Sequence, residues 1–395
     1  SQIIKDTSYK ILNCQGMYLS PGFVDIKCHL RVPGEEHKEN FNYASESASA
    51  AGITSLVCMP NTNPIIDNVS LVELLQRKAK KESDVKIYTT ASLTKGLEGK
   101  VISEIGLLKE AGAVGFTDAI KAVDDSTVML RALKYASAFD ALVMQHPEDK
   151  SLSEGGNMNA GLLATQLGIK GIPIEAEVLQ VDRDIRLAEM TNSRIHFLNI
   201  TTELALKSIE IAQNKGIRVS CSTSPHYFSL TEKDIRKWRT FAKVSPPLRD
   251  KKNTDAIKLG IKNNIITCIT SDHSPHDTDS KRLPFEQSSS GIIGFESLLP
   301  LTLKLKDEKK ISLLKIIDLL SSAPAKLLNL KAGSLKKGSP ADLVVFDANS
   351  KIKLSSELIK SKSKNFPYER LNAKGKILLT MVDGKIIYND RKFNF

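Results

Sequence analysis

The chain has 395 residues, of which 41% are hydrophobic and 26% charged. This composition supports a packed core and excludes wholesale disorder. No apolar run approaches the roughly 18–20 residues that a membrane helix needs, and the polar first residues do not resemble a signal peptide. The length suits one large domain with an appendage, or two domains. Because the chain starts at Ser1 without an initiator Met, we expect the true N-terminus to lie upstream.

Basic residues outnumber acidic ones by 56 to 45, which gives a formal net charge of +11. A basic balance can indicate nucleic-acid binding, but the lysines are spread along the chain. We therefore expect solvated helix faces and loops, with a docking surface for an acidic partner as the alternative, and no nucleic-acid or membrane partner. The five cysteines are odd in number and include no CxxC pair, which favours buried thiols in a cytoplasmic protein.

Short β-rich apolar runs alternate with helical stretches through the first three quarters of the chain. Helical periodicity is clear over 70–81, 126–139 and 203–215. The eight apolar runs are 22–30, 53–60, 85–92, 113–118, 141–146, 194–200, 217–224 and 265–273. Strands that alternate with helices predict a parallel sheet, and eight such units predict an α/β fold of the closed (β/α)8 TIM type.

Nearly every run ends on a chemically capable polar residue. These residues are His29, Asn61, Asp118, His146, Asn199, His226 and Asp272. In a barrel the carboxyl ends of all strands converge on one mouth. Polar residues also end strands for no functional reason, but the composition of the whole set favours a shared pocket.

The pattern changes after the barrel. Residues 338–347 and 375–390 read as short antiparallel strands. The first residues of the chain fit the same small module. We therefore predict a barrel over 21–332 and a discontinuous β module formed by 1–20 and 333–395, with its N-terminal part incomplete.

The first apolar run ends D-x-K-x-H-x-R, which places Asp25, Lys27, His29 and Arg31 on one face of a strand. Inward positions two residues apart are how a barrel strand presents paired metal ligands. His at both positions would be a strong zinc signal. Lys27 occupies the first position, and an ammonium group is a poor ligand that repels a dication.

The motif SDHSPH follows the last run. A carboxylate such as Asp272 at a metal site can bind the ion and take the proton of the attacking water. His273 is expected to pack as an ordinary loop residue. His276 opens the polar segment 274–294, whose length and Gly, Ser and Pro content suggest a mobile loop over the barrel mouth.

These motifs together resemble the dihydroorotases of the amidohydrolase superfamily. The resemblance covers nearly the whole chain and includes PGFVDIKCHLRVPG, MPNTNPIIDN, QHPED, SPPLRDKKN and SDHSPH. It implies a (β/α)8 barrel with a small β-sandwich from both termini. It also implies interconversion of N-carbamoyl-aspartate and dihydroorotate in pyrimidine synthesis, with zinc to activate hydroxide and a strand-eight Asp to carry the proton.

When the family's metal ligands are matched to this sequence position by position, the resemblance implies a damaged metal site. The substituted ligands are Lys27, Ala119 and Asn199. The remaining metal ligands are His29, His146 and Asp272, and Asp272 is also the catalytic carboxylate. Asp118 is adjacent to the substituted bridging position, but strand parity makes it a doubtful replacement. Arg31, Asn61 and His276 match the family's substrate-binding residues, whereas Ser245 replaces an Asn.

The resemblance leaves alternatives open. The first is a weak or non-catalytic partner of aspartate transcarbamoylase, similar to metal-site-degraded paralogues in the family, either homo-oligomeric or in complex with that enzyme. The second is an active dihydroorotase with a single zinc ion and Asp272 as general base. A third, less favoured, is another cyclic amidohydrolase of the hydantoin or allantoin type. N-carbamoyl-aspartate or dihydroorotate is the expected ligand.

Overall fold

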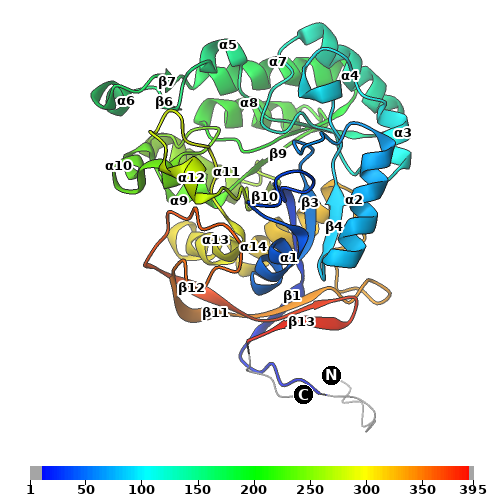
Figure 1. The fold of residues 1–395 in the computed structure, drawn as a ribbon, viewed down its shortest axis with the longest axis vertical. Helices are drawn as coiled ribbons and strands as arrows, with labels where there is room; N and C mark the ends of the chain where they lie inside the picture. Colours follow the sequence, from blue (N-terminus) through cyan, green and yellow to red (C-terminus); the bar gives the residue numbers. More distant parts are fainter. Residues whose placement is uncertain (1–10, 391–395) are drawn as a thin grey trace.

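The computed structural model describes residues 11–390, in which parallel strands form a closed barrel (Figure 1). The barrel strands are β2 (Phe23–Cys28), β3 (Ile53–Cys58), β4 (Lys86–Thr89), β5 (Leu142–Gln145), β8 (Arg194–Phe197), β9 (Val219–Thr223) and β10 (Cys268–Ile269). The fourth place in the ring is taken by Phe116, which forms parallel bridges to Ala91 and Val143. A parallel bridge between Cys28 and His273 closes the ring. The predicted (β/α)8 fold is confirmed.

Two of the eight predicted strands are much shorter than the apolar runs that predicted them. The run 113–118 pairs mainly through Gly115 and Phe116, whose carbonyl oxygens accept from Ala91 and Met144. The last run is a regular strand only at Cys268–Ile269.

Helices surround the barrel, and the three that the periodicity predicted are confirmed. The long helices are α2 (Val69–Glu82), α4 (Ser126–Ala138), α7 (Glu175–Thr191), α8 (Glu203–Asn214), α11 (Lys251–Lys262) and α13 (Phe295–Lys309). Asn68, Asp125, Thr202 and Asp250 cap α2, α4, α8 and α11, because each side chain accepts a hydrogen bond from a first-turn amide.

Shorter elements connect these parts. They are α1 (Phe41–Ala50), α3 (Ile105–Glu110), α5 (Lys150–Ser153), β6 (Met158–Asn159), α6 (Leu162–Leu167), β7 (Gly171–Ile172), α9 (Pro225–Ser229), α10 (Ile235–Trp238), α12 (Thr278–Arg282), α14 (Leu313–Ile317) and α15 (Ala323–Leu327), with tight helical turns at Lys95–Leu97, Glu232–Asp234 and Arg239–Ala242 and a wider π-helical turn at Asp318–Ser322. The segment 274–294, expected to be a loop, contains α12.

A four-stranded antiparallel sheet lies below the barrel and joins both ends of the chain (Figure 1). Its order is β1 (Tyr18–Pro21), β11 (Leu343–Leu354), β12 (Leu371–Val382) and β13 (Lys385–Asn389). Gly52 lies where the barrel meets this sheet, with a φ of 79°, and a Cβ there would lie 2.8 Å from Val344 and 2.9 Å from Ile377. Residues 1–10 and 391–395 of the predicted β module are outside the described part of the chain.

Cys28, Cys58, Cys221 and Cys268 are buried free thiols. Within residues 11–390 no helix is both long and apolar enough to cross a membrane. The expectation that lysines lie on solvated surfaces is wrong for Lys27, Lys243 and Lys281, which are at most 4% exposed. Each of the three has a polar partner in the interior, as described below.

Candidate functional site

Lys27 and Asp272 form a buried ion pair at the barrel mouth. The Nζ of Lys27 lies 2.8 Å from Oδ1 of Asp272, and the two side chains are only 2% and 8% exposed. Lys27 is the penultimate residue of β2, and Asp272 follows β10 in the left-handed backbone region, with a φ of 53°. The ammonium group therefore lies against the carboxylate that the resemblance assigns to a metal.

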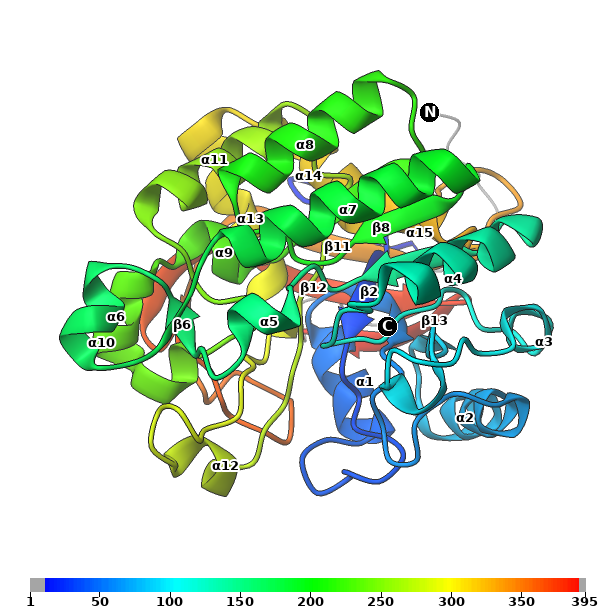
Figure 2. The ribbon, with the colours of Figure 1, turned by 90° about the horizontal axis from the view of Figure 1, so that it is seen from above.

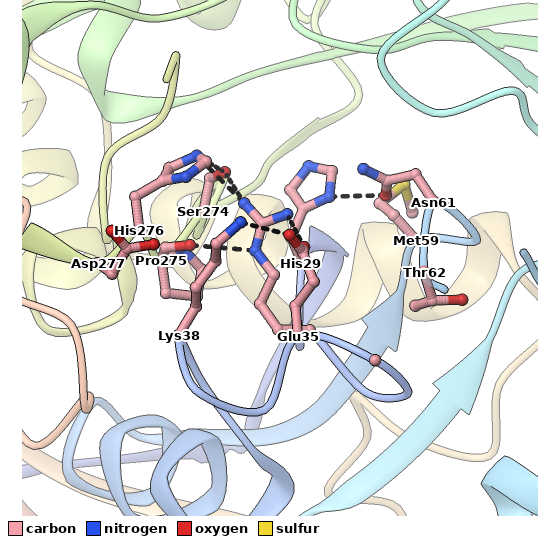
Figure 3. A network of polar contacts seen from close by, with 12 residues as sticks. His29, Glu35, Lys38, Met59, Asn61, Thr62, Ser274, Pro275, His276 and Asp277 are labelled. Atoms are coloured by element: carbon pink, nitrogen blue, oxygen red, sulfur yellow. Dashed lines mark hydrogen bonds and ion pairs between the residues drawn. The ribbon is translucent and has the colours of Figure 1, made fainter. Parts of the chain in front are cut away.

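His29 and Asn61 lie next to this pair and contact each other (Figure 3). The Nδ1 of His29 is 2.9 Å from Oδ1 of Asn61, so this nitrogen carries the proton and donates it. Burial, followed by the charges of Arg31 and Lys27, lowers the pKa of His29 well below its usual value. His29 is thus a neutral imidazole of fixed tautomer.

Arg31 joins the end of the first strand to the segment that follows the last. Its Nε donates to the carbonyl oxygen of Pro275 at 3.0 Å, and Nη2 donates to Ser274 Oγ at 3.1 Å. Its Nη1 donates to Glu35 at 3.0 Å, and Glu35 in turn contacts Lys38. Most of the guanidinium N–H groups are therefore directed at the protein itself.

His276 lies beside Arg31, and its Nε2 has three polar neighbours, of which Oγ of Ser274, at 3.5 Å, is the most distant. This nitrogen is 3.1 Å from Nη2 of Arg31 and 2.9 Å from the carbonyl oxygen of Ser290. Burial and the charge of Arg31 lower the pKa of His276, so the ring is neutral. A neutral ring can accept from Arg31 or donate to Ser290, but it cannot do both through one nitrogen. Of these contacts, only the one with Arg31 joins the segment 274–294 to the mouth, because Ser274 and Ser290 belong to the same segment.

His146 directly follows β5, and its Nε2 is 3.3 Å from Oγ of Ser245. Its Nδ1 has no hydrogen-bond partner among the described residues, and burial lowers its pKa to about 3. Asn199 lies two residues beyond β8 and is fully buried, and neither end of its amide has a partner in the described part of the chain. Buried polar atoms without partners are rare. His146 and Asn199 therefore make this part of the barrel interior polar.

Asp118 does not replace the missing bridging carboxylate. It accepts hydrogen bonds from the backbone N–H of Thr94, at 2.9 Å, and from the Thr94 hydroxyl. Its carboxylate therefore stabilises the loop after β4. Ala119, at the bridging position, has a φ of 59°. Among non-glycine residues Asp and Asn adopt this region far more readily than Ala, so the backbone at 119 suits the acidic residue that the resemblance implies there.

Sequence reasoning placed His226 at a strand end but missed its partner, Tyr368. The Nδ1 of His226 lies 2.8 Å from the Tyr368 hydroxyl, and the two rings stack with centroids 6.1 Å apart. Burial lowers the pKa of His226 to about 4. Tyr368 comes from the segment between β11 and β12, and no motif marks it in the sequence.

The residues present do not fit a zinc site. Between residues 11 and 390 no group of three or more His, Cys, Asp and Glu side chains lies where it could hold a metal ion. The three expected ligands, His29, His146 and Asp272, are not gathered into such a group. The Lys27 ammonium, paired with Asp272, adds a positive charge that repels a dication.

The fold has close counterparts among solved structures of hydantoinases and dihydropyrimidinases. The L-hydantoinase (dihydropyrimidinase) of Arthrobacter aurescens superposes with a TM-score of 0.87 at 24% identity, over 97% of this chain and 89% of the other. The dihydropyrimidinase of Brevibacillus agri superposes with a TM-score of 0.85 at 23% identity, over 99% and 89%. The barrel and the sheet built from both chain ends therefore define the amidohydrolase fold class.

Sequence comparison gives the family. Residues 16–204 match the model described as dihydro-orotase-like, and residues 230–388 match the amidohydrolase family. The dihydroorotase of Syntrophus aciditrophicus is 39% identical over 381 residues, 96% of this chain and 89% of the relative. That of Syntrophotalea carbinolica is 41% identical over 377 residues, 95% and 89%. The chain belongs to the dihydroorotase family.

Proposed function

We propose that this chain is a non-catalytic, or nearly inactive, member of the dihydroorotase family that acts as a partner of aspartate transcarbamoylase. The observation that carries the proposal is the ion pair between Lys27 and Asp272. A metal ion lowers the pKa of its bound water and so makes hydroxide available at neutral pH. An ammonium group cannot do this, although it neutralises the carboxylate.

Two further positions support the loss of chemistry. Ala119 offers no oxygen ligand, and the neighbouring Asp118 is occupied by Thr94. Asn199 offers a neutral amide where an imidazole would be needed. Second-shell losses alone cost about 10–100-fold in metal affinity or activity, and the loss of direct ligands should cost more.

The partner follows from the resemblance to paralogues with degraded metal sites, which assemble with aspartate transcarbamoylase. Arg31, Asn61 and His276, which correspond to the family's substrate-binding residues, are still present at the mouth. We therefore extend the proposal to binding of N-carbamoyl-aspartate or dihydroorotate without turnover. Isothermal titration with N-carbamoyl-aspartate tests this extension, and an absence of saturable heat would end it.

Hydrolysis of dihydroorotate by the purified protein, with and without added zinc, tests the central proposal. An intact zinc dihydroorotase serves as the positive control, and the metal content of the same sample is measured. We expect neither turnover nor stoichiometric zinc. Sedimentation of the protein with the aspartate transcarbamoylase of its own organism tests the partnership, for which we expect a faster-sedimenting complex. Two independently sedimenting species would contradict the partnership.

The alternative is an active dihydroorotase with a single metal ion and Asp272 as general base. Two observations favour it: the neutral, oriented imidazole of His29 and the unpartnered Nδ1 of His146. Turnover that requires zinc and is lost in the Asp272→Ala variant would establish this alternative. Hydantoin and allantoin belong in the same assay, since turnover of either would identify a different cyclic-amide substrate.

A further inference from the structure

A groove of about 1320 Å³ lies on the outer side of the segment that crosses the barrel mouth. It is bounded by the end of α6, by α10 and the turn after it, and by α12, which lie along one side of the barrel (Figure 2). We call it the outer groove. Its apolar lining includes Leu167, Ile169, Phe241, Leu283, Phe285 and Phe366.

Several of these apolar side chains are open to solvent. Leu167 is 41% exposed, Phe241 40% and Leu283 45%. Single exposed apolar residues are ordinary, but a group of them that lines one concavity with a polar rim is typical of an interaction site. The outer groove therefore has the apolar floor that a docked segment would cover.

The rim of the outer groove carries an unbalanced positive charge. Five exposed lysine and arginine side chains line the groove, whereas Glu369 is the one acidic residue in the lining; Lys281 also lines it but is buried. Glu369 already accepts from the backbone N–H of Ser356 at 2.9 Å. Arg239 and Arg282 form no ion pair within the described residues. An apolar floor inside a basic rim complements a segment that has apolar residues on one face and carboxylates on the other.

The wall of the outer groove is held in place by two buried lysines. Lys243 donates to the carbonyl oxygens of Phe285, Glu286 and Ser288, at 2.6, 3.0 and 2.8 Å. Lys281 donates to the carbonyl oxygens of Ser289 and Gly291, at 2.8 and 3.1 Å. A preformed wall lowers the ordering cost of binding, so the groove is built before any partner arrives.

From these features we propose that the outer groove docks an acidic, amphipathic segment of a partner protein. A second copy of this chain fits poorly, because its net charge is +11 and its own copy of the rim is basic. The proposal goes beyond the proposed function, because it holds whether or not the barrel hydrolyses dihydroorotate.

Selection of random 12-residue peptides displayed on phage tests the proposal. The full chain is the bait, and a variant with Arg239→Glu and Arg282→Glu is the counter-selection bait. We expect enrichment of peptides that combine Asp or Glu with Leu, Ile or Phe. A selected peptide, labelled with fluorescein, should bind the wild type and lose about tenfold or more in affinity for the counter-selection variant.

Two further variants make the result specific. Replacing Phe241 and Leu283 by Ser should weaken the same peptide by about tenfold without changing the charge. A matched control, Arg77→Glu with Lys81→Glu on the exposed face of α2, makes the same charge change on the other side of the barrel and should keep the affinity within about twofold.

Three outcomes would overturn the proposal. One is no enrichment over the starting library, and another is a selected peptide that binds the Arg239→Glu, Arg282→Glu variant as well as it binds the wild type. The third is tighter, groove-dependent binding of a single-stranded oligonucleotide or of phosphatidylserine vesicles than of any selected peptide. Circular dichroism of each variant separates loss of binding from loss of folding.

Discussion

The Nζ of Lys27 lies 2.8 Å from Oδ1 of Asp272, and this contact joins the first strand of the barrel to the last. The two strands meet at the seam where Cys28 bridges His273. A metal held by ligands from both strands would tie the same seam. The ion pair thus makes, at this seam, the strand-to-strand connection that such ligands would make.

The first prediction concerns the stability of this seam. Lys27→Met should lower the free energy of unfolding by roughly 3–5 kcal/mol, because it leaves the Asp272 carboxylate buried without a counter-charge. Urea denaturation followed by circular dichroism at pH 7.5 measures the loss. The double variant Lys27→Met, Asp272→Asn should recover most of it, since no charge is then buried. A loss below about 1 kcal/mol in the single variant would show that the pair does not hold the seam.

The second prediction concerns restoration of the metal site. The combined substitutions Lys27→His, Ala119→Asp and Asn199→His should produce a chain that binds more zinc than the wild type. The backbone supports this, because the φ values at 119 and 199, 59° and 53°, suit residues that bear ligands at strand ends. Elemental analysis after dialysis measures zinc per chain, and cobalt substitution gives an independent visible absorption spectrum.

A matched control for the restored site adds His146→Asn to the same three substitutions. It removes one expected ligand and should lower the bound zinc, since each direct ligand contributes to affinity. If the three-substitution chain binds no more zinc than the wild type, the mouth has changed in ways beyond its ligands, and the description of a damaged site would be too simple.

The third prediction concerns Arg31, whose N–H groups reach Glu35, Ser274 and the carbonyl oxygen of Pro275. Arg31→Met should release the segment 274–294 and cost roughly 1.5–3 kcal/mol for each charged hydrogen bond lost without replacement. Hydrogen exchange followed by mass spectrometry should show faster exchange in this segment. Arg77→Met, on an exposed face of α2, is the control and should leave the exchange unchanged. Unchanged exchange in the Arg31 variant would mean that other contacts, among them those of Lys243 and Asn365, are enough to hold the segment.

The barrel was predictable because its pattern is local. Each apolar run and each periodic helix can be recognised within about 15 residues, and strand ends such as Lys27 and His146 then follow from the topology. The same reasoning predicted that Lys27 would repel a dication. It did not predict the direct contact between Lys27 and Asp272. That contact depends on side-chain conformations, which the spacing of residues in the sequence does not determine.

Buried lysines show a second limit of sequence reasoning. Lys243 and Lys281 look like surface residues in the sequence, yet they lie inside and donate to backbone carbonyl oxygens. The neighbouring sequence does not distinguish them from solvated lysines, because their hydrogen-bond acceptors are backbone carbonyl oxygens of a distant or irregular segment. Asp118 differs in that strand parity made it a doubtful ligand in advance, and the structure shows it bonded to Thr94, a partner that the sequence could not name.

The last prediction concerns acid sensitivity through His196. This ring is fully buried in β8, its Nδ1 is 2.8 Å from Ser220 Oγ, and burial lowers its pKa from 6.5 to about 3. Below pH 6.5 the unfolded chain takes up a proton at His196 that the folded chain excludes. The stability that neutral His196 contributes is therefore present above pH 6.5 and is lost progressively as the pH falls toward 3.

His196→Gln removes this proton uptake, which makes the prediction measurable. We subtract the free energy of unfolding of the variant from that of the wild type at each pH. This difference should be about 2 kcal/mol lower at pH 5.0 than at pH 7.5, because each pH unit below 6.5 costs the wild type about 1.36 kcal/mol. Urea denaturation at the two pH values measures it. His37→Gln, at a side chain that is 64% exposed, controls for removal of an imidazole and should change stability far less. A pH-independent difference for the His196 variant would mean that the folded interior accepts the proton, and that the barrel interior is more hydrated than its burial indicates.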